Sequence, residues 1–169
     1  MQKYFDIVDT HDNSIGVKTA QECHANPDLI HRVVHFTLFD SKTKSYLITQ
    51  RSFAVKFDSG KWCFMGEHVL SGESYGTAIK KGVADELGIT GTVSFKELAH
   101  HIFTYDTQTE FIRFFLIDWN GENIQINTSE IIDYKWVSLE QLKENQNNYS
   151  EMTKYWIRTI SSNTLGTAS

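Results

Sequence analysis

The chain has 169 residues, of which 40% are hydrophobic and 22% charged, and this composition is typical of a soluble globular domain with a sizeable core. Its formal net charge of −5 gives no general attraction to nucleic acid or to an anionic membrane, so neither partner is expected. The absence of a long apolar run or a secretory signal, with only the cysteines Cys23 and Cys63, makes a cytoplasmic location the default expectation.

The first third of the chain predicts short strands joined by polar turns. β-Branched and aromatic residues favour strands, and clusters of Asn, Asp, Ser and Gly favour turns. The N-terminal residues, about 1–20, are therefore expected to form a hairpin. The expected segments are strands 4–8 and 15–18 around a turn at 11–14, a loop over 20–28, paired strands 33–39 and 46–49, and a polar loop over 56–60.

A helix is predicted in the middle of the chain. Residues 66–73 are expected to be a loop, because they contain two glycines and little periodicity. Ser74 can cap the helix that follows, and Gly88 is a typical helix end. Apolar residues recur every four positions between them and define one buried face. These residues are Tyr75, Ile79, Val83 and Leu87.

The second half of the chain predicts further strands and then terminal helices. Many strands around one central helix, followed by helices, indicate an α+β fold with a sandwiched mixed sheet. The expected strands cover 93–98, 102–105, 111–119 and 131–137, and the expected helices cover 138–145 and 152–160.

The central helix and the loop before it carry the most informative chemistry. A glycine loop brings backbone groups close to a ligand, and Asp85 and Glu86 stand near the C-terminal end of the helix. Adjacent carboxylates beside a tight loop suit a hard cation such as Mg²⁺, whose other ligands are waters and substrate phosphates. The alternative is a solvated acidic helix face, and spacing alone leaves both open.

This segment resembles the Nudix box, in which a glycine loop and a glutamate precede a helix with an arginine and further glutamates. The flanking residues 46–51 and 133–142 also resemble the family, so the likeness covers about residues 30–145. The residues that match are Glu73, Val83, Glu86, Gly88 and Ile89, with Lys81 in place of arginine and Asp85 in place of glutamate.

The resemblance implies a single Nudix domain over residues 1–169. Its fold would be an α/β/α sandwich with a mixed central sheet. The N-terminal hairpin would cover about 1–20, the core about 30–145 and a C-terminal helix about 148–161.

The resemblance also implies a role for the polar residues of the box. Glu73 and Lys81 would form an ion pair that locks the loop to the helix. Asp85 and Glu86 would hold Mg²⁺ or Mn²⁺, helped by a carbonyl before or at Gly66. The partner of this metal would be a small diphosphate.

The box departs from its consensus at two positions. Gly82 stands where most Nudix hydrolases have a metal-binding or basic glutamate, and Glu67 stands where the box has its first glycine. The late-strand histidine that serves one Nudix branch corresponds to Ile131 here, so His68 or Glu130 would have to act as the base. Glu130 lies where Nudix proteins often place a further metal-binding carboxylate. Its alternative interpretation is a surface acid at a strand end.

A second resemblance is to the isopentenyl-diphosphate isomerase branch of the superfamily. His24 and His31 lie seven residues apart, and Arg51 and Lys56 follow. This layout implies a metal site at the histidines and diphosphate binding by the two cations. Tyr105 fits the aromatic position of that branch. The alternatives are packed or surface histidines, surface cations, and a core or edge tyrosine.

Other features oppose an isomerase. Met65 takes the place of the catalytic cysteine, and Cys63 lies two residues earlier. The third histidine of the branch falls on Glu67, which becomes a candidate metal ligand, with His68 adjacent. The later glutamate pair is represented at best by Glu110. Isomerisation needs acid–base groups on both faces of the substrate, so the displaced cysteine weighs against it.

The sequence therefore favours a metal-dependent Nudix hydrolase that cleaves the phosphoanhydride of a small nucleoside or prenyl diphosphate. Glu86, Asp85 and Glu130 would hold Mg²⁺ or Mn²⁺, which polarises water. Arg51 and Lys56 would bind the phosphates.

Three alternatives stay open. The first is a prenyl diphosphate isomerase. The second, suggested by Gly82, is a catalytically weakened Nudix module that binds a diphosphate ligand. The third is a structural domain without a ligand. An oligomer is possible, and the box does not fix the organic group of the substrate, because loops outside it choose that group.

Overall fold

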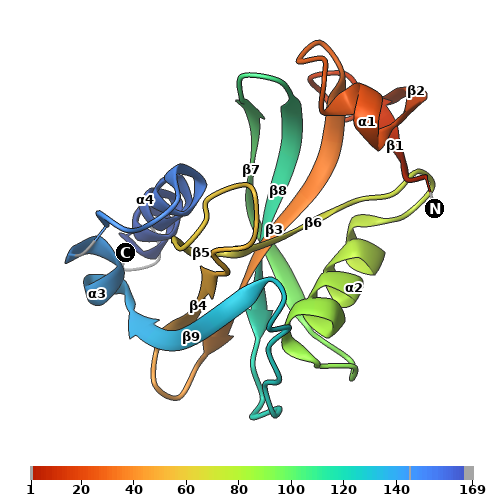
Figure 1. Cartoon of the computed structure of the whole chain (residues 1–169). Helices are drawn as coiled ribbons and strands as arrows, with labels where there is room; N and C mark the ends of the chain where they lie inside the picture. Colours follow the sequence, from red (N-terminus) through yellow and green to blue (C-terminus); the bar gives the residue numbers. More distant parts are fainter. Residues whose placement is uncertain (1, 145, 166–169) are drawn as a thin grey trace.

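The computed structural model describes residues 2–144 and 146–165. A mixed sheet of nine strands runs through this part of the chain, with helices packed on both faces (Figure 1). This α/β/α arrangement confirms the expected α+β fold class. In chain order the elements are β1 (Tyr4–Val8), β2 (Ser14–Thr19), α1 (Ala20–Cys23), β3 (Ile30–Asp40), β4 (Ser45–Arg51), β5 (Trp62–Cys63), β6 (Met65–His68), α2 (Tyr75–Leu87), β7 (Phe95–Thr104), β8 (Thr109–Asp118), β9 (Ile131–Ser138), α3 (Leu139–Glu144) and α4 (Glu151–Leu165).

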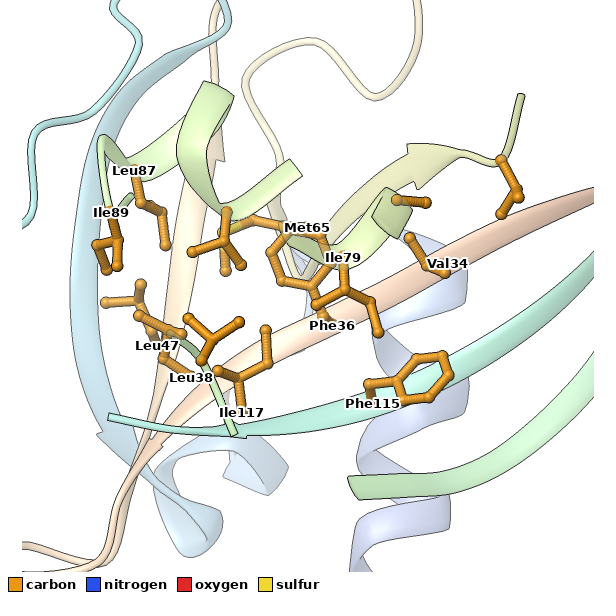
Figure 2. Close-up of a cluster of buried hydrophobic side chains, with 14 residues drawn as sticks. Val34, Phe36, Leu38, Leu47, Met65, Ile79, Leu87, Ile89, Phe115 and Ile117 are labelled. Carbon is orange, nitrogen blue, oxygen red and sulfur yellow. The ribbon is translucent and has the colours of Figure 1, made fainter. Parts of the chain in front are cut away.

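Strand β3 is the centre of the sheet. It runs parallel to β8 along almost its whole length and antiparallel to β1, β4 and β6. Successive side chains of a strand point to opposite faces, so β3 serves two layers. Its even-numbered residues Val34, Phe36 and Leu38 pack beneath α2, as Figure 2 shows. Its odd-numbered Val33 packs on the other face with residues of α3 and α4.

Helix α2 has the ends that the sequence predicts. Ser74 is the N-cap, and its hydroxyl accepts a hydrogen bond from the backbone N–H of Thr77. Gly88 ends the helix at a φ of 69°, a left-handed conformation that glycine adopts without steric cost. The buried residues of the helix include Ile79, Val83 and Leu87, so the predicted apolar face is confirmed. Within the described residues, no helix combines the length and apolarity that a membrane crossing needs.

The N-terminal hairpin is present as β1 and β2, and its turn is fastened to the sheet. Asp12 in the turn accepts hydrogen bonds from Nε of Arg32 (2.6 Å), from Nη2 of Arg113 (2.7 Å) and from the hydroxyl of Tyr75 (3.0 Å). These partners belong to β3, β8 and α2, so one carboxylate ties the hairpin to three elements. The hairpin also carries the buried ring of Phe5.

The predicted loop over 66–73 is wrong at its start, because residues 65–68 form strand β6. This strand pairs with β3 from Met65–Phe36 to His68–Val33. Its partner lies some thirty positions earlier in the chain, and the glycine and short length hide it from local patterns. The strand matters because it brings His68 and Gly66 next to β3.

Two further segment predictions need correction. The predicted loop over 20–28 begins with the helical turn α1, which Thr19 and Glu22 fix by reciprocal hydrogen bonds. The strands predicted over 93–98 and 102–105 are one strand, β7, which continues through a register shift against β8. The C-terminal helix, expected over about 148–161, is α4 and begins at Glu151.

Candidate active site

Three histidines from separate elements converge near one end of β3. His24 ends helix α1, His31 lies at the start of β3, and His68 ends β6. One ligand nitrogen of each lies within 4.8 Å of the other two. Nε2 of His24 is 3.2 Å from Nε2 of His68. We call these three residues the histidine cluster.

The sheet register produces this convergence. Strands β3 and β6 pair Val33 with His68, and His31 lies two residues earlier on the same face of β3. Phe5 of β1 stacks on the rings of His31 and His68, with centroid distances of 5.1 and 4.9 Å. Since Phe5 is buried, it supports one side of the histidine cluster with a rigid apolar ring.

A buried carboxylate adjoins the histidine cluster. The parallel register of β3 and β8 pairs His31 with Glu110, and Oε1 of Glu110 lies 4.0 Å from Nε2 of His68. Glu110 is 5% exposed and accepts hydrogen bonds from the amide of Gln108 (2.8 Å) and from the hydroxyl of Tyr105. Burial raises the pKa of Glu110 to about 7, while the hydrogen bond from Tyr105 acts in the opposite direction.

The histidine cluster has the donor chemistry of a metal site. Burial lowers the pKa of His31 to about 4 and that of His68 to about 3, and the neighbouring histidines add to both shifts, so these imidazoles are neutral at physiological pH. Nε2 of His31 is buried and has no hydrogen-bond partner among the described residues. A buried polar nitrogen without a partner is costly, and neutral imidazoles with a carboxylate suit a divalent cation. The residues present therefore fit a metal ion.

Charged residues also gather at the C-terminal end of α2. Glu86 accepts a hydrogen bond from the backbone N–H of Gly66 and interacts with the charges of Arg51 and Glu130. Burial, and then repulsion from Glu130, raises the pKa of Glu86 to about 8. Asp85, by contrast, is exposed. Among the described residues, these carboxylates are not part of a group whose ligand atoms lie as close together as those of the histidine cluster.

Lys81 connects α2 to the segment before it. Its Nζ lies 3.3 Å from Oε1 of Glu67 and 3.5 Å from Oε2 of Glu73. Glu73 also accepts a hydrogen bond from the backbone N–H of Leu70 at 3.0 Å. The ion pair that the box resemblance implies between Glu73 and Lys81 is therefore present, and Glu67 shares the same ammonium group.

A pocket of about 320 Å³ extends from the histidine cluster to Arg51 and Gly66. Tyr105 and Glu110 line it. So does Cys63, whose thiol is buried and has a pKa raised mainly by that burial. Met65 instead lies in the core beneath α2. The cysteine that stands two residues before the expected position is thus the one that faces the pocket.

The model of the NUDIX domain matches residues 29–156 of the chain. The chain belongs to the NUDIX domain family. Relatives similar to this NUDIX protein include "Isopentenyl-diphosphate Delta-isomerase 2" of Photorhabdus laumondii, 28% identical over 169 residues that cover 95% of this chain and 91% of the relative. Another is "Isopentenyl-diphosphate Delta-isomerase 1" of Aromatoleum aromaticum, 28% identical over 160 residues that cover 89% and 86%.

Solved structures share the fold of this NUDIX protein. DR0079 from Deinococcus radiodurans has a TM-score of 0.74 at 20% identity and covers 92% of this chain and 98% of its own. A MutT protein from Methanosarcina mazei has a TM-score of 0.69 at 22% identity, with 82% and 96% covered. These likenesses confirm the predicted Nudix-type fold.

The NUDIX helix has a steric reason to carry glycine at position 82. A Cβ on Gly82 would lie 2.9 Å from Cε1 of Phe36 and 3.1 Å from Cβ of Glu67. Phe36 is fully buried in the core beneath α2, where close packing leaves its ring little room to move. Helix α2 and strand β6 therefore approach each other more closely than a side chain at this position permits.

The two predicted phosphate ligands are placed differently. Arg51 lines the pocket, and its Nε donates a hydrogen bond to the carbonyl oxygen of Phe57 at 2.9 Å. Lys56 is exposed, and its Nζ lies 5.2 Å from the centre of the Phe57 ring. Glu130, the predicted third metal ligand, is exposed just before β9. Arg51 is therefore the better placed of the two cations.

Sequence reasoning missed several residues of the site. Phe5 supports the histidine cluster, Gln108 donates to Glu110, and His35 and Met152 line the pocket. The alternation of β3 is a signal that identifies His35, because it shares a face with His31. No pattern in the sequence connects Phe5 with histidines that lie in other elements.

Proposed function

We propose that this NUDIX protein is a divalent-cation-dependent enzyme for a small organic diphosphate, and that it moves a carbon–carbon double bond in a prenyl diphosphate. The convergence of the histidine cluster, Glu110 and Cys63 on one pocket carries the proposal. Similarity to proteins named isopentenyl-diphosphate isomerases, along most of both chains, supports it.

The shift of a double bond needs one proton added to a carbon and another removed from a carbon of the same allylic unit. Cys63 and Glu110 both line the pocket, and the hydroxyl of Tyr105 holds the Glu110 carboxylate in place. One of these groups gives a proton and the other takes one, so the reaction neither gains nor loses a proton overall. Cys63 thereby fills the role that the family resemblance expects at position 65.

The histidine cluster would hold a metal ion beside these groups. His24, His31 and His68 offer imidazole nitrogens, and Glu110 borders them with a carboxylate. A bound divalent cation supplies positive charge that stabilises anionic oxygens. Imidazole nitrogens suit transition-metal ions such as Zn²⁺, and the neighbouring carboxylate of Glu110 also suits Mn²⁺, whereas Mg²⁺ prefers oxygen ligands alone. We therefore assign Mg²⁺ to the diphosphate and Glu86, and a second ion to the histidines.

The diphosphate is assigned to the end of the pocket formed by Arg51 and Gly66. A guanidinium group presents a fork of N–H donors that matches phosphate oxygens. Gly66 is exposed, so a ligand can approach its backbone closely. The part of the pocket lined by Cys63 and Glu110 would then receive the organic group.

Hydrolysis of a phosphoanhydride is the second candidate function. The observation that favours it is the proximity of Glu86 and Glu130 to Arg51 at the end of the box helix. Carboxylates at that position suit a metal-activated water. Solved structures with this fold include proteins named MutT and an Ap4A hydrolase of C. elegans, although these likenesses concern the fold.

One incubation distinguishes the two reactions. The protein is mixed with isopentenyl diphosphate, Mg²⁺ and Mn²⁺ or Zn²⁺, and both the allylic isomer and released phosphate are measured by NMR. We expect the allylic isomer from the wild type, and its loss in Cys63→Ala and Glu110→Gln. Cys23→Ala, which removes the other buried cysteine, is the matched control and should retain activity.

The outcomes separate the candidates. Phosphate release that Glu86→Gln abolishes, without any allylic isomer, would establish hydrolysis instead. Tight binding without either product would indicate a diphosphate-binding module. An unchanged isomerisation rate in Cys63→Ala would remove the proposed role of that thiol.

A further inference from the structure

The two ring nitrogens of His35 have different surroundings. His35 lies in β3 on the face that lines the pocket. Its Nδ1 is 3.0 Å from the indole Nε1 of Trp156 in helix α4. Within the described residues its Nε2 has no hydrogen-bond partner. One nitrogen is therefore bound by the protein and the other is free toward the pocket.

Trp156 determines where the proton of His35 resides. An indole N–H donates and cannot accept, so Nδ1 of His35 must accept, and the neutral ring must carry its proton on Nε2. Trp156 is fully buried, stacked on Phe114 at 4.7 Å and edge-on to Tyr155 at 4.9 Å. The indole is thus clamped and cannot turn away. Burial lowers the pKa of His35 to about 4, so the ring stays neutral at physiological pH.

The Nε2 edge of His35 lies beside Gly66 of β6. Strands β3 and β6 pair His35 with Gly66, and a Cβ on Gly66 would lie 2.9 Å from Cδ2 and 3.1 Å from Nε2 of His35. The glycine therefore leaves this edge uncovered. Arg51 lines the same pocket. A fixed N–H donor close to a guanidinium group and an exposed glycine backbone complements an anionic oxygen.

Resting on the diphosphate-binding function proposed above, we propose that His35 is a substrate-binding residue whose Nε2–H donates a hydrogen bond to a diphosphate oxygen of the ligand. Trp156 is the positioning residue that holds His35 in the donating tautomer. A group that only accepts would satisfy the indole equally well. An imidazole, in addition, accepts at one side of the ring and donates at the other, which connects a buried indole to the ligand.

The first test uses the wild-type protein with ¹⁵N-labelled histidine. Long-range nitrogen–proton NMR spectra identify the tautomer of each ring. We expect His35 to be protonated at Nε2 and not at Nδ1, and we expect its Nε2 resonance to move when inorganic diphosphate and Mg²⁺ are added. A proton on Nδ1, or an Nε2 resonance that stays fixed at saturating diphosphate, overturns the proposal.

The second test measures the binding of inorganic diphosphate with Mg²⁺ by calorimetry. His35→Phe removes the donor, and we expect binding to weaken by about tenfold to a hundredfold, as for other hydrogen bonds to charged groups. His35→Gln retains an amide N–H and should recover most of the affinity. Trp156→Phe frees the tautomer, so the loss should be about twofold to fivefold. His100→Phe, at an exposed position of β7, is the matched control and should bind like the wild type.

The outcomes separate this proposal from the one on which it rests. If the wild type binds no diphosphate, the proposed function and the role of His35 both fail. If the wild type binds diphosphate and His35→Phe binds it equally well, the role of His35 alone fails. Thermal melts verify folding, and if His35→Phe does not fold, the resonance shift in the wild type decides.

Discussion

The two candidate ligand-binding regions of the site are built in opposite ways. In the first, the histidine cluster draws its members from the C-cap of α1 and from β3 and β6, and their ligand nitrogens lie within 4.8 Å of one another. In the second, at the end of α2, Asp85 and Glu86 are neighbours in the sequence, yet Asp85 is exposed while Glu86 interacts with the charge of Arg51. Strand register, more than closeness along the chain, therefore decides which side chains meet.

Removal of the metal should have the largest effect on turnover, and it tests the histidine cluster. A chelator should reduce turnover to background, and Mn²⁺ or Zn²⁺ should restore it. His31→Ala should weaken the binding of the ion assigned to the histidine cluster by more than about tenfold, because it removes a buried nitrogen donor. The allylic isomer formed per unit time measures the first effect, and calorimetric metal titration measures the second. His100→Ala is the control, and equal metal affinity in the two variants would contradict a site at the histidine cluster.

The second-largest expected effect is a loss of stability, caused by a substitution near the end of α2. Gly82→Glu restores the family consensus, but we expect it to lower the free energy of unfolding by about 3 kcal/mol, since the new side chain meets Phe36 and Glu67. Urea unfolding measures the loss, with Lys80→Glu on the exposed side of the same helix as control. A Gly82→Glu protein as stable as the wild type would show that α2 and β6 can separate at low cost.

The hairpin turn that secures Phe5 offers a third test. Asp12→Ala should cost about 2–3 kcal/mol of stability, because it removes the carboxylate that Arg32 and Arg113 share and leaves them only Asp6 and Glu97 as partners. We also expect weaker metal binding at the histidine cluster, with diphosphate binding unchanged. Asp118→Ala, at the exposed end of β8, is the control. If Asp12→Ala weakened the binding of the metal and of diphosphate alike, the two ligand-binding regions would not be independent.

The carboxylate of Asp12 should also make the stability of the protein depend on pH. Burial acts to raise the pKa of Asp12, but hydrogen bonds from Arg32, Arg113 and Tyr75 outweigh it and hold the pKa below its ordinary value of 3.8. A lowered pKa contributes stability above the ordinary value, and the contribution disappears as the pH falls through the lowered one. Thermal melts should therefore show the wild type and Asp12→Ala converging below about pH 3.8.

The smallest expected effect is on diphosphate binding, and it distinguishes Lys56 from Arg51. Lys56 is exposed, so Lys56→Ala should weaken diphosphate binding by less than about fivefold, as for other exposed charges. Arg51 lines the pocket, and Arg51→Ala should cost about tenfold or more. Calorimetry with inorganic diphosphate measures both. The reverse order would place the diphosphate over the loop that carries Lys56 and away from Gly66.

The features that could be predicted from the sequence are those that depend on residues close together along the chain. The caps of α2 and its apolar face follow from nearby residues, and the structure confirms them. Strand β6 depends on pairing with β3, so its residues alone predicted a loop. The pocket position of Cys63 and the core position of Met65 follow from the path between two short strands, which composition does not reveal.

The candidate site was predictable to a similar degree. His24, His31 and Arg51 were identified by their resemblance to one branch of the family. The closeness of His68 to the other two histidines depends on strand register, and the contacts of Gly82 depend on core packing. Both are tertiary properties, so no window of sequence contains them.

The alternation of β3 has a consequence for how such a protein can diversify. Its even-numbered residues fill the layer under α2, and its odd-numbered residues His31, Val33 and His35 face the ligand side. Exchanging an odd-numbered residue changes what the protein recognises and leaves the supporting layer intact. Inserting one residue would exchange the two sets and lose both at once. New ligand specificities should therefore arise by substitutions in β3, and selection should remove insertions and deletions in this strand.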